Sequence, residues 1–405
     1  MVLVVGPTVG APVVRVIRFG PTARCAARHA RHRMVATATG VVPSVPIAAA
    51  RPVLWTPTHV LVTASAYAQP HGRSIVERLT AAGVEDVTLL AGDRLPSLRQ
   101  ADERATYARA KRTLAVVTSA ASKRRPTPIP PSADWSFPLA EGCPGHCQYC
   151  YLAGSLSGQP ITRVYADLPR ILAGLDDVVG AGSVTSGTEA RGHEGTTFEA
   201  SCYTDPLAVE HVTGSLAATI THFGTHDWAG PVQLRLTTKY DDVDGLLDLP
   251  HHGRTRIRAS VNVGGVEKFE GGTARVAARL RALGKLARAG YPVGLTIAPI
   301  MPVEDWEQQY GELLAAAGAE LADVPDLDLT VECITHRFTP KSKDVQLGWY
   351  PKTKLDLDEE TRTRKHGKFC AVKYVYDKDT MKDLRTWFEA ALARELPQAR
   401  YLYWT

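Results

Sequence analysis

The sequence of 405 residues lacks the long apolar run that a membrane-spanning helix requires. No stretch approaches eighteen uninterrupted apolar residues, which excludes a membrane span. Cysteine is also scarce, and seven in the whole chain are too few for a disulfide-stabilised scaffold. Hydrophobic content of 44% is close to the globular average, which excludes disorder of the whole chain. These observations predict a cytoplasmic globular protein that has no association with a membrane.

Acidic residues and lysine are absent from the first 76 residues, which hold eight arginines. This segment therefore carries a charge of +8 and the remaining chain one of −3, which together give the net charge of +5. Nucleic-acid binding can accordingly be argued only from local patches of charge. Residues 1–51 show no sustained apolar periodicity, so we expect a disordered extension, or sequence upstream of a start near Met34. A transit peptide is the alternative that this arginine-rich, acid-poor composition leaves open.

Residues 52–124 have the pattern of a small α/β domain. A proline-rich linker over residues 125–131 is expected to follow it and to interrupt regular structure. The expected strands and helices of the domain are Val53–Thr63, Arg73–Ala82, Val84–Leu90, Leu98–Lys111 and Leu114–Val117.

Residues 132–335 alternate strand and helix patterns six times, which predicts a parallel sheet closed into a partial (β/α)6 barrel. Thr273–Ala289 is the clearest helix, and the Gly/Ser/Thr-rich Gly180–Gly195 is expected to be a flexible surface insertion. Such barrels carry their chemistry at the carboxyl ends of the strands. The expected strands are Ser136–Ala140, Thr197–Cys202, Val232–Thr237, Arg256–Asn262, Val293–Pro299 and Leu327–Ile334.

Three of the seven cysteines, Cys143, Cys147 and Cys150, fall within eight residues on a glycine-containing loop after the first of these strands. Structural zinc sites need four ligands, and chelation by His146 as a fourth would be strained by its neighbour Cys147. A four-iron cluster usually takes four cysteines, so three would leave one iron open for reaction. The spacing therefore predicts an iron–sulfur centre, and packing as small hydrophobic residues is the much weaker alternative.

The Cys-x3-Cys-x2-Cys loop opening a partial barrel resembles the radical S-adenosylmethionine superfamily. An ordered set of further stretches, from about Pro52 to the C-terminus, is similar to the spore photoproduct lyase family. These stretches are Leu139–Leu152, Phe198–Cys202, Thr238–Tyr240, Ile334–Thr339, Tyr350–Thr353 and Lys373–Tyr376.

The resemblance implies a [4Fe-4S] cluster held by Cys143, Cys147 and Cys150, and S-adenosylmethionine on its open iron. A 5′-deoxyadenosyl radical would then start reversal of 5-thyminyl-5,6-dihydrothymine to two thymines in UV-damaged DNA. Cys202 would return a hydrogen atom to the product radical, and a tyrosine matching Tyr151 would help to relay the radical from the cysteine back towards the cofactor. Tyr149 falls where the superfamily places an aromatic against adenine. The reaction also needs an electron donor such as flavodoxin or ferredoxin.

Four further residues are expected to hold the cofactor. Lys239 offers a positive charge for its carboxylate, and Thr204 follows the proposed hydrogen donor closely. Ser260 and Asn262 alternate on one strand, so their side chains face the same side. A polar strand end in solvent is the alternative for this pair.

The C-terminal region, residues 336–405, is expected to contact DNA. Lysine and arginine are interleaved there with aromatic residues, a composition suited to phosphate contacts and base stacking. A second basic run, residues 104–125, holds seven cations and no acid, and solvated basic faces are the alternative for both. The predicted DNA contacts are Arg337, Lys341, Tyr350, Lys352 and Lys373.

Pro144 and Tyr203 depart from the pattern of the family. Because Tyr203 follows the proposed donor directly, another nucleic-acid substrate for the same chemistry stays open. A zinc-stabilised DNA-binding protein without catalysis is the hypothesis from a different class.

Overall fold

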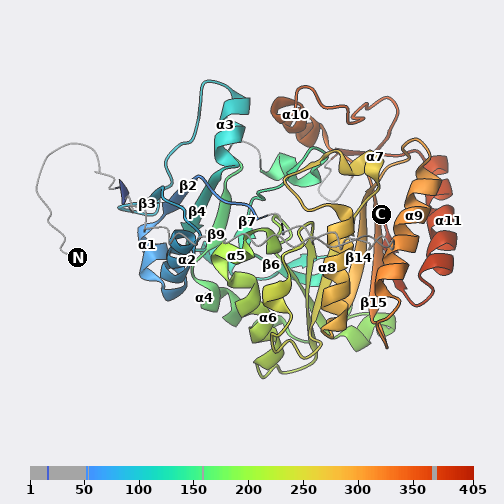
Figure 1. Cartoon of the computed structure of the whole chain (residues 1–405), viewed down its shortest axis with the longest axis horizontal. Helices are drawn as coiled ribbons and strands as arrows, with labels where there is room; N and C mark the ends of the chain where they lie inside the picture. The colour runs from blue at the N-terminus through green and yellow to red at the C-terminus, as the bar shows by residue number, and fades with distance from the viewer. Residues whose placement is uncertain (1–15, 18–51, 53, 157–158, 367–371) are drawn as a thin grey trace, which may run out of the picture.

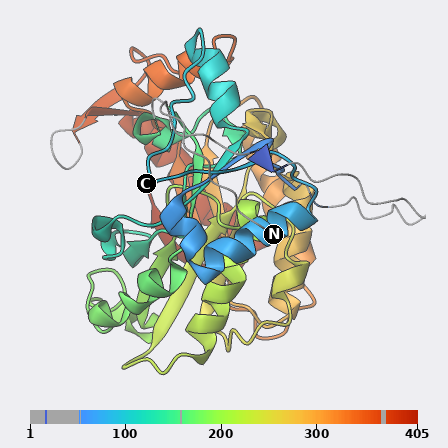
Figure 2. The same ribbon diagram turned by 90° about the vertical axis from the view of Figure 1, so that its left-hand side faces the viewer.

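The computed structural model describes residues 16–17, 52, 54–156, 159–366 and 372–405. Its strands form two main sheets with helices packed around them (Figures 1 and 2). The smaller sheet belongs to the N-terminal part of the chain, and the larger one forms the barrel that the sequence predicts. No described helix is long and apolar enough to cross a membrane.

The N-terminal sheet has the strand order β1-β3-β2-β4-β9-β7. Its four central strands are parallel, whereas β1 and β7 pair antiparallel at the two edges. Apolar side chains such as Val60, Val62 and Leu114 fill its core. The strands are β1 (Val16–Ile17), β2 (His59–Val62), β3 (Val87–Leu89), β4 (Thr113–Val117), β7 (Ala140–Glu141) and β9 (Thr162–Tyr165).

The large sheet has the order β18-β15-β14-β12-β11-β10-β6-β5. All of its neighbouring pairs are parallel except β5 with β6, which confirms the predicted partial barrel. The strands β5 and β18 are additions to the six that were expected. Its strands are β5 (Thr127–Ile129), β6 (Ala133–Phe137), β10 (Thr196–Ala200), β11 (Val232–Thr238), β12 (Thr255–Val261), β14 (Val293–Ile300), β15 (Leu329–Thr335) and β18 (Arg400–Trp404).

Side chains along the large sheet alternate between two faces. One face carries apolar residues such as Leu234, Ile257 and Val331, which pack against the surrounding helices. The other face carries buried arginine and glutamate. The helices are α1 (Ala64–Ala68), α2 (Pro70–Ala81), α3 (Glu103–Ala110), α4 (Leu168–Ala173), α5 (Glu210–Thr213), α6 (Ser215–Thr225), α7 (Gly264–Glu267), α8 (Val276–Arg288), α9 (Trp306–Leu321), α10 (Pro340–Trp349) and α11 (Lys378–Glu395).

Two small ribbons complete the fold. The first pairs β8 (His146–Cys147) with β13 (Glu270–Gly271) and thereby ties the cysteine loop to the segment after α7. The second pairs β16 (Thr363–His366) with β17 (Val372–Val375).

The expected linker over residues 125–131 is not free of regular structure. Residues Thr127–Ile129 form β5, which pairs with β6 at the edge of the large sheet. An edge position tolerates Pro128 because its missing N–H removes no bond inside the sheet. The N-terminal sheet also takes β7 and β9 from beyond residue 131, so the expected boundary at residue 124 does not separate the two sheets.

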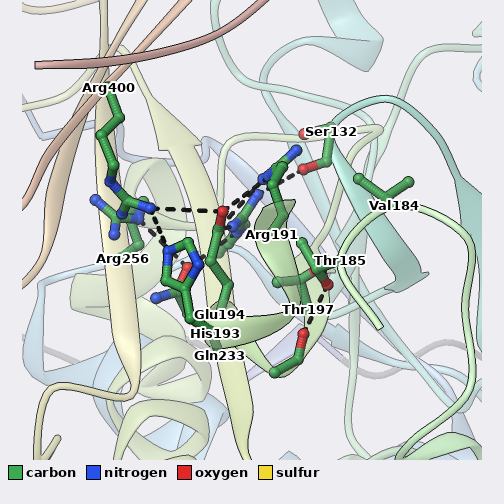
Figure 3. Close-up of polar contacts among 12 residues, drawn as sticks. Ser132, Val184, Thr185, Arg191, His193, Glu194, Thr197, Gln233, Arg256 and Arg400 are labelled. Atoms are coloured by element: carbon green, nitrogen blue, oxygen red, sulfur yellow. Dashed lines mark hydrogen bonds and ion pairs between the residues drawn. The ribbon is translucent and has the colours of Figure 1, made fainter. Parts of the chain in front are cut away.

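The segment Gly180–Gly195, expected to be a flexible surface insertion, is partly exposed as expected but is anchored to the barrel by buried contacts. Thr185 is fully buried, and the Asp134 carboxylate accepts hydrogen bonds from the backbone N–H groups of Val184 and Thr185. Glu194 is also buried and forms ion pairs with Arg191 and Arg235 at the amino end of the barrel (Figure 3). The segment therefore closes this end of the barrel, because buried charges inside the barrel require partners.

Most of the expected N-terminal extension, residues 1–51, lies outside the described residues. The exception is Val16–Ile17, which forms β1 and pairs with β3.

Candidate functional site

The cysteine loop follows β6 and β7 and lies at the carboxyl edge of the large sheet. Lys111, which follows α3 of the N-terminal part, supports the loop from beneath. Its buried ammonium donates to the carbonyl oxygens of Cys143 and Gly145, both at 2.5 Å. The pairing of β8 with β13 fixes the loop from its other side. Two distant segments thus hold the backbone of the three-cysteine motif.

The three thiols form a donor set that fits an iron–sulfur cluster. Burial raises the pKa of Cys143 to about 11 and that of Cys147 to about 12, and it also raises the pKa of Cys150. Negative charge on Cys150 further raises the pKa of each of the other two, so the sulfurs lie within electrostatic reach of one another. The three sulfurs are not yet arranged as metal ligands in this structure, since no three described histidine, cysteine or acidic side chains are placed to hold a metal ion. Three buried thiols on one loop, with cationic Lys111 nearby, nevertheless match the chemistry of such a cluster.

His146 does not act with the cysteines in this structure. Its Nδ1 is hydrogen-bonded to the Tyr107 hydroxyl at 3.0 Å, and Tyr107 in turn contacts the hydroxyl of Tyr350. Burial lowers the pKa of His146 to about 4, so the ring is neutral. This contact joins α3, the cysteine loop and the end of α10.

Glu270 organises the pocket beside the cysteine loop. Its carboxylate accepts from Lys239 Nζ at 2.8 Å and from Arg279 at 2.5 Å, and the buried Tyr149 hydroxyl also donates to it. Burial alone would raise the pKa of Glu270, but Lys239 and Arg279 outweigh that effect and lower it. The group keeps a net charge of +1, because two cations face one carboxylate. Lys239 is therefore paired with Glu270, but the group as a whole keeps one positive charge that can attract an anionic ligand.

The other predicted cofactor residues differ in how many hydrogen bonds they already make within the protein. Ser260 accepts from Lys239 Nζ at 2.9 Å. Asn262 is fully engaged, donating to the Pro299 carbonyl and accepting from the Tyr310 hydroxyl. Thr204 is the opposite case, since its buried hydroxyl has no hydrogen-bond partner among the described residues. This hydroxyl is therefore free to bond to a ligand.

Cys202 lies beyond the carboxyl end of β10, on the wall of a cavity of about 200 Å³. Its Sγ is 4.0 Å from the hydroxyl of Ser136, and burial raises the pKa of the thiol to about 11. Ser201 holds the turn with a φ of 57°, and its hydroxyl accepts from the backbone of Leu139 and Ala140. The thiol is thus protonated at neutral pH and open to the cavity.

A larger cavity of about 1220 Å³ shares part of its wall with the Cys202 cavity. Lys123, Glu141 and Tyr203 line both. Arg163 of β9 and Arg94, which lies in the loop after β3, also line the larger one. The exposed Tyr203, which departs from the family pattern, therefore lies where the two cavities join.

The predicted DNA contacts do not form one patch. Arg337 lies over the half-exposed Tyr151, with its guanidinium 5.2 Å from the ring centroid. Burial lowers the pKa of Lys373, and nearby Arg337 lowers it further, so these two cations are neighbours. Tyr350 and Lys352 instead line a separate cleft beside the cysteine loop, and Lys341 lies in the first turn of α10.

The second basic run, residues 104–125, is also divided. Lys111 is buried under the cysteine loop, Arg124 pairs with buried Asp167, and Lys123 pairs with Glu141. Only part of this run is therefore free for phosphate contacts.

Sequence reasoning missed Lys111, Tyr107, Glu270 and Arg279. Each contacts the site through a segment far from it in the chain, so residue spacing contains no local signal for any of them. Glu270 directly precedes two glycines, a pattern that predicts a turn. The pattern does not show which side chains Glu270 contacts.

These features define a class of protein: a partial (β/α) barrel with a three-cysteine loop and a neutral thiol at the carboxyl edge of its sheet. The family model "Spore photoproduct lyase" matches residues 55–405. The chain belongs to the spore photoproduct lyase family, whose members are radical S-adenosylmethionine enzymes.

Curated relatives agree with this assignment. Spore photoproduct lyase of Geobacillus sp. (strain Y412MC61) is 39% identical over 86% of this chain and 98% of its own. That of Bacillus subtilis (strain 168) is 36% identical over the same shares.

Solved structures agree as well. Spore photoproduct lyase complexed with dinucleoside spore photoproduct superposes with a TM-score of 0.78, at 36% identity over 87% of this chain and 99% of that one. A mutant of the enzyme with bound AdoMet and the same dinucleoside matches equally well.

Proposed function

We propose that this protein repairs DNA by reversing the spore photoproduct, 5-thyminyl-5,6-dihydrothymine, to two thymines. The observation that carries the proposal is the match over nearly the whole length of an enzyme structure with that dinucleoside bound. The Cys202 cavity lies at the carboxyl edge of the sheet, where a barrel of this kind places its chemistry.

Cys143, Cys147 and Cys150 would hold a [4Fe-4S] cluster, with Lys111 fixing the loop beneath it. When bound, the cluster and S-adenosylmethionine would supply a 5′-deoxyadenosyl radical for hydrogen abstraction from the lesion. The net positive group of Lys239, Glu270 and Arg279 would attract the carboxylate of S-adenosylmethionine. The unpaired Thr204 hydroxyl would supply it with a hydrogen bond.

Cys202 is the hydrogen donor in this proposal. After the bond between the two thymines breaks, one thymine radical needs a hydrogen atom. The S–H bond of Cys202 breaks, its hydrogen completes the thymine, and the unpaired electron stays on sulfur. The raised pKa suits this role because only a protonated thiol carries the hydrogen. Tyr151, which lies beneath Arg337, would then donate its hydroxyl hydrogen to the sulfur, restoring the thiol and relaying the radical back towards the cofactor.

The adjoining cavity would receive the flanking DNA. Arg94 and Arg163 line it, and Arg337 and Lys373 are neighbouring cations close to Tyr151. Cations in these positions suit phosphate contacts, and a lesion that must reach the Cys202 thiol has to leave the base stack.

The test is anaerobic reconstitution with iron and sulfide, followed by reaction with S-adenosylmethionine, dithionite and dinucleoside spore photoproduct. We expect two thymidines and 5′-deoxyadenosine. A colourless protein that binds zinc and yields no 5′-deoxyadenosine would refute the enzymatic assignment. A brown protein that cleaves S-adenosylmethionine but leaves the dinucleoside intact would refute the substrate.

A further inference from the structure

A cationic cleft of about 490 Å³ adjoins the cysteine loop on a side that the proposed reaction does not use. It lies between α3, the segment after α7 and the end of α10, elements gathered along the upper edge in Figure 1. Its described wall contains no acidic side chain, and its cations form no ion pair with any described residue. These cations are Arg104, Lys268, Lys352 and Lys354, all exposed.

The wall of this cleft reaches the cysteine loop directly. Gln148, which lies between Cys147 and Cys150, lines the cleft and accepts a hydrogen bond of 2.6 Å from Thr353. Tyr350 also lines it, and the charges of Cys147 and Cys150 add to burial in raising the pKa of that phenol. The hydroxyl of Tyr350 contacts that of Tyr107, which is bonded to His146 of the loop. The part of the cleft wall formed by Gln148 and Tyr350 therefore lies close to the three thiols.

The cleft is separate from the cavities assigned to the lesion. It shares no lining residue with the Cys202 cavity or with the larger cavity beside it. A partner in the cleft would approach the cysteine loop while DNA occupies the Cys202 side. DNA, in contrast, must deliver its lesion to Cys202 and gains nothing from contact with Gln148.

We propose that this cleft docks an acidic protein that carries one electron at a time, of the flavin or iron–sulfur class. This inference rests on the proposed function, since only a reductively cleaved cofactor requires such a partner. Each cleavage takes one electron, so the carrier is oxidised by one electron as the cluster is reduced by one. The exposed cations meet the acidic rim of the carrier, and Gln148 and Tyr350 lie between it and the cysteines.

The test compares the double variant Lys268→Glu/Lys354→Glu with the control Lys378→Glu/Lys382→Glu. The control makes the same change of charge on α11, which supplies no residue to the cleft. Labelled flavodoxin is titrated onto the reconstituted full chain and followed by fluorescence anisotropy. We expect the cleft variant to bind at least about tenfold more weakly than the control, with a smaller difference at high salt.

A second measurement separates docking from catalysis. Formation of 5′-deoxyadenosine driven by NADPH, flavodoxin reductase and flavodoxin should fall at least about tenfold in the cleft variant. The dithionite-driven rate and the affinity for lesion DNA should stay as in the control. Equal flavodoxin affinity in both variants would overturn the proposal. An equally large fall in DNA affinity would assign the cleft to nucleic acid instead. Failure of the proposed function would show differently, as no thymidine with dithionite in any variant.

Discussion

The interior of the large sheet and its carboxyl end are both rich in charge, but they differ in what surrounds the charged groups. In the interior, Arg258 of β12 pairs with Glu199 of β10 and Glu332 of β15, and all three side chains are buried. At the open carboxyl end, Lys239 and Arg279 share the single carboxylate of Glu270, and the Cys202 thiol faces a cavity. We expect the first group to stabilise the barrel and the second to bind and react.

The largest effect is expected from Cys147→Ala at the open end. Two remaining cysteines cannot hold a cluster with one open iron in place, so S-adenosylmethionine cleavage should be abolished. The matched control is Cys333→Ala, which removes a fully buried thiol of β15 at a cost of roughly 1 kcal/mol. Bound iron and 5′-deoxyadenosine are measured in both. Iron loading equal to wild type in Cys147→Ala would remove this cysteine from the cluster.

The next largest effect is expected from Arg258→Leu in the interior of the large sheet. It leaves Glu199 and Glu332 buried without their cation and should lower the free energy of unfolding by about 3–5 kcal/mol. The control Arg288→Leu breaks an exposed pair with Glu320 and should cost less than about 1 kcal/mol. Urea unfolding measures both. Equal losses would show that the buried group of Arg258, Glu199 and Glu332 does not stabilise the fold.

A smaller, pH-dependent effect is expected from His336, which follows β15 at the open end. Both of its ring nitrogens are buried and have no hydrogen-bond partner in the described part of the chain, and burial followed by nearby Arg362 lowers its pKa from 6.5 to about 3. As the pH falls, His336 therefore becomes protonated in the unfolded chain at a higher pH than in the folded protein. This histidine stabilises the fold fully above pH 6.5, and its contribution is lost as the pH falls from there towards 3.

Between pH 8 and pH 5 that loss amounts to ~2 kcal/mol of unfolding free energy. His336→Phe cannot take up the proton, so its unfolding free energy should fall by ~2 kcal/mol less than that of wild type over the same range. Urea unfolding at the two pH values measures the difference. The same pH dependence in both proteins would contradict the assignment to His336.

Much of the site could be predicted from the sequence because its key donors lie close together in the chain. The spacing of Cys143, Cys147 and Cys150 places three ligands on one loop whatever the rest of the fold does. Cys202 was found because it follows a short β-rich run and because Phe198–Cys202 resembles the family. The other strands were predicted from similar short β-rich runs, in which apolar residues alternate with polar or charged ones.

What could not be predicted depends on contacts between distant segments. Lys111 looked like part of a basic surface run, but the packing of the N-terminal sheet buries it under the cysteine loop. Gly180–Gly195 has the composition of a flexible loop, yet Asp134 and Arg235 inside the barrel require its Thr185 and Glu194 as partners. Amino-acid composition indicates the local structural preference of a segment. It does not indicate which buried charges elsewhere in the fold the segment will pair with.

The central claim is that Cys202 completes the repaired thymine, and Cys202→Ala tests it most directly. The variant is reconstituted and given S-adenosylmethionine, dithionite and dinucleoside spore photoproduct, and the products are separated by mass. The account predicts that 5′-deoxyadenosine still forms, because hydrogen abstraction precedes the need for the thiol. The yield of two thymidines should fall sharply. Other products, formed by the thymine radical that receives no hydrogen from a thiol, should appear in their place. A normal yield of two thymidines from Cys202→Ala would contradict the account.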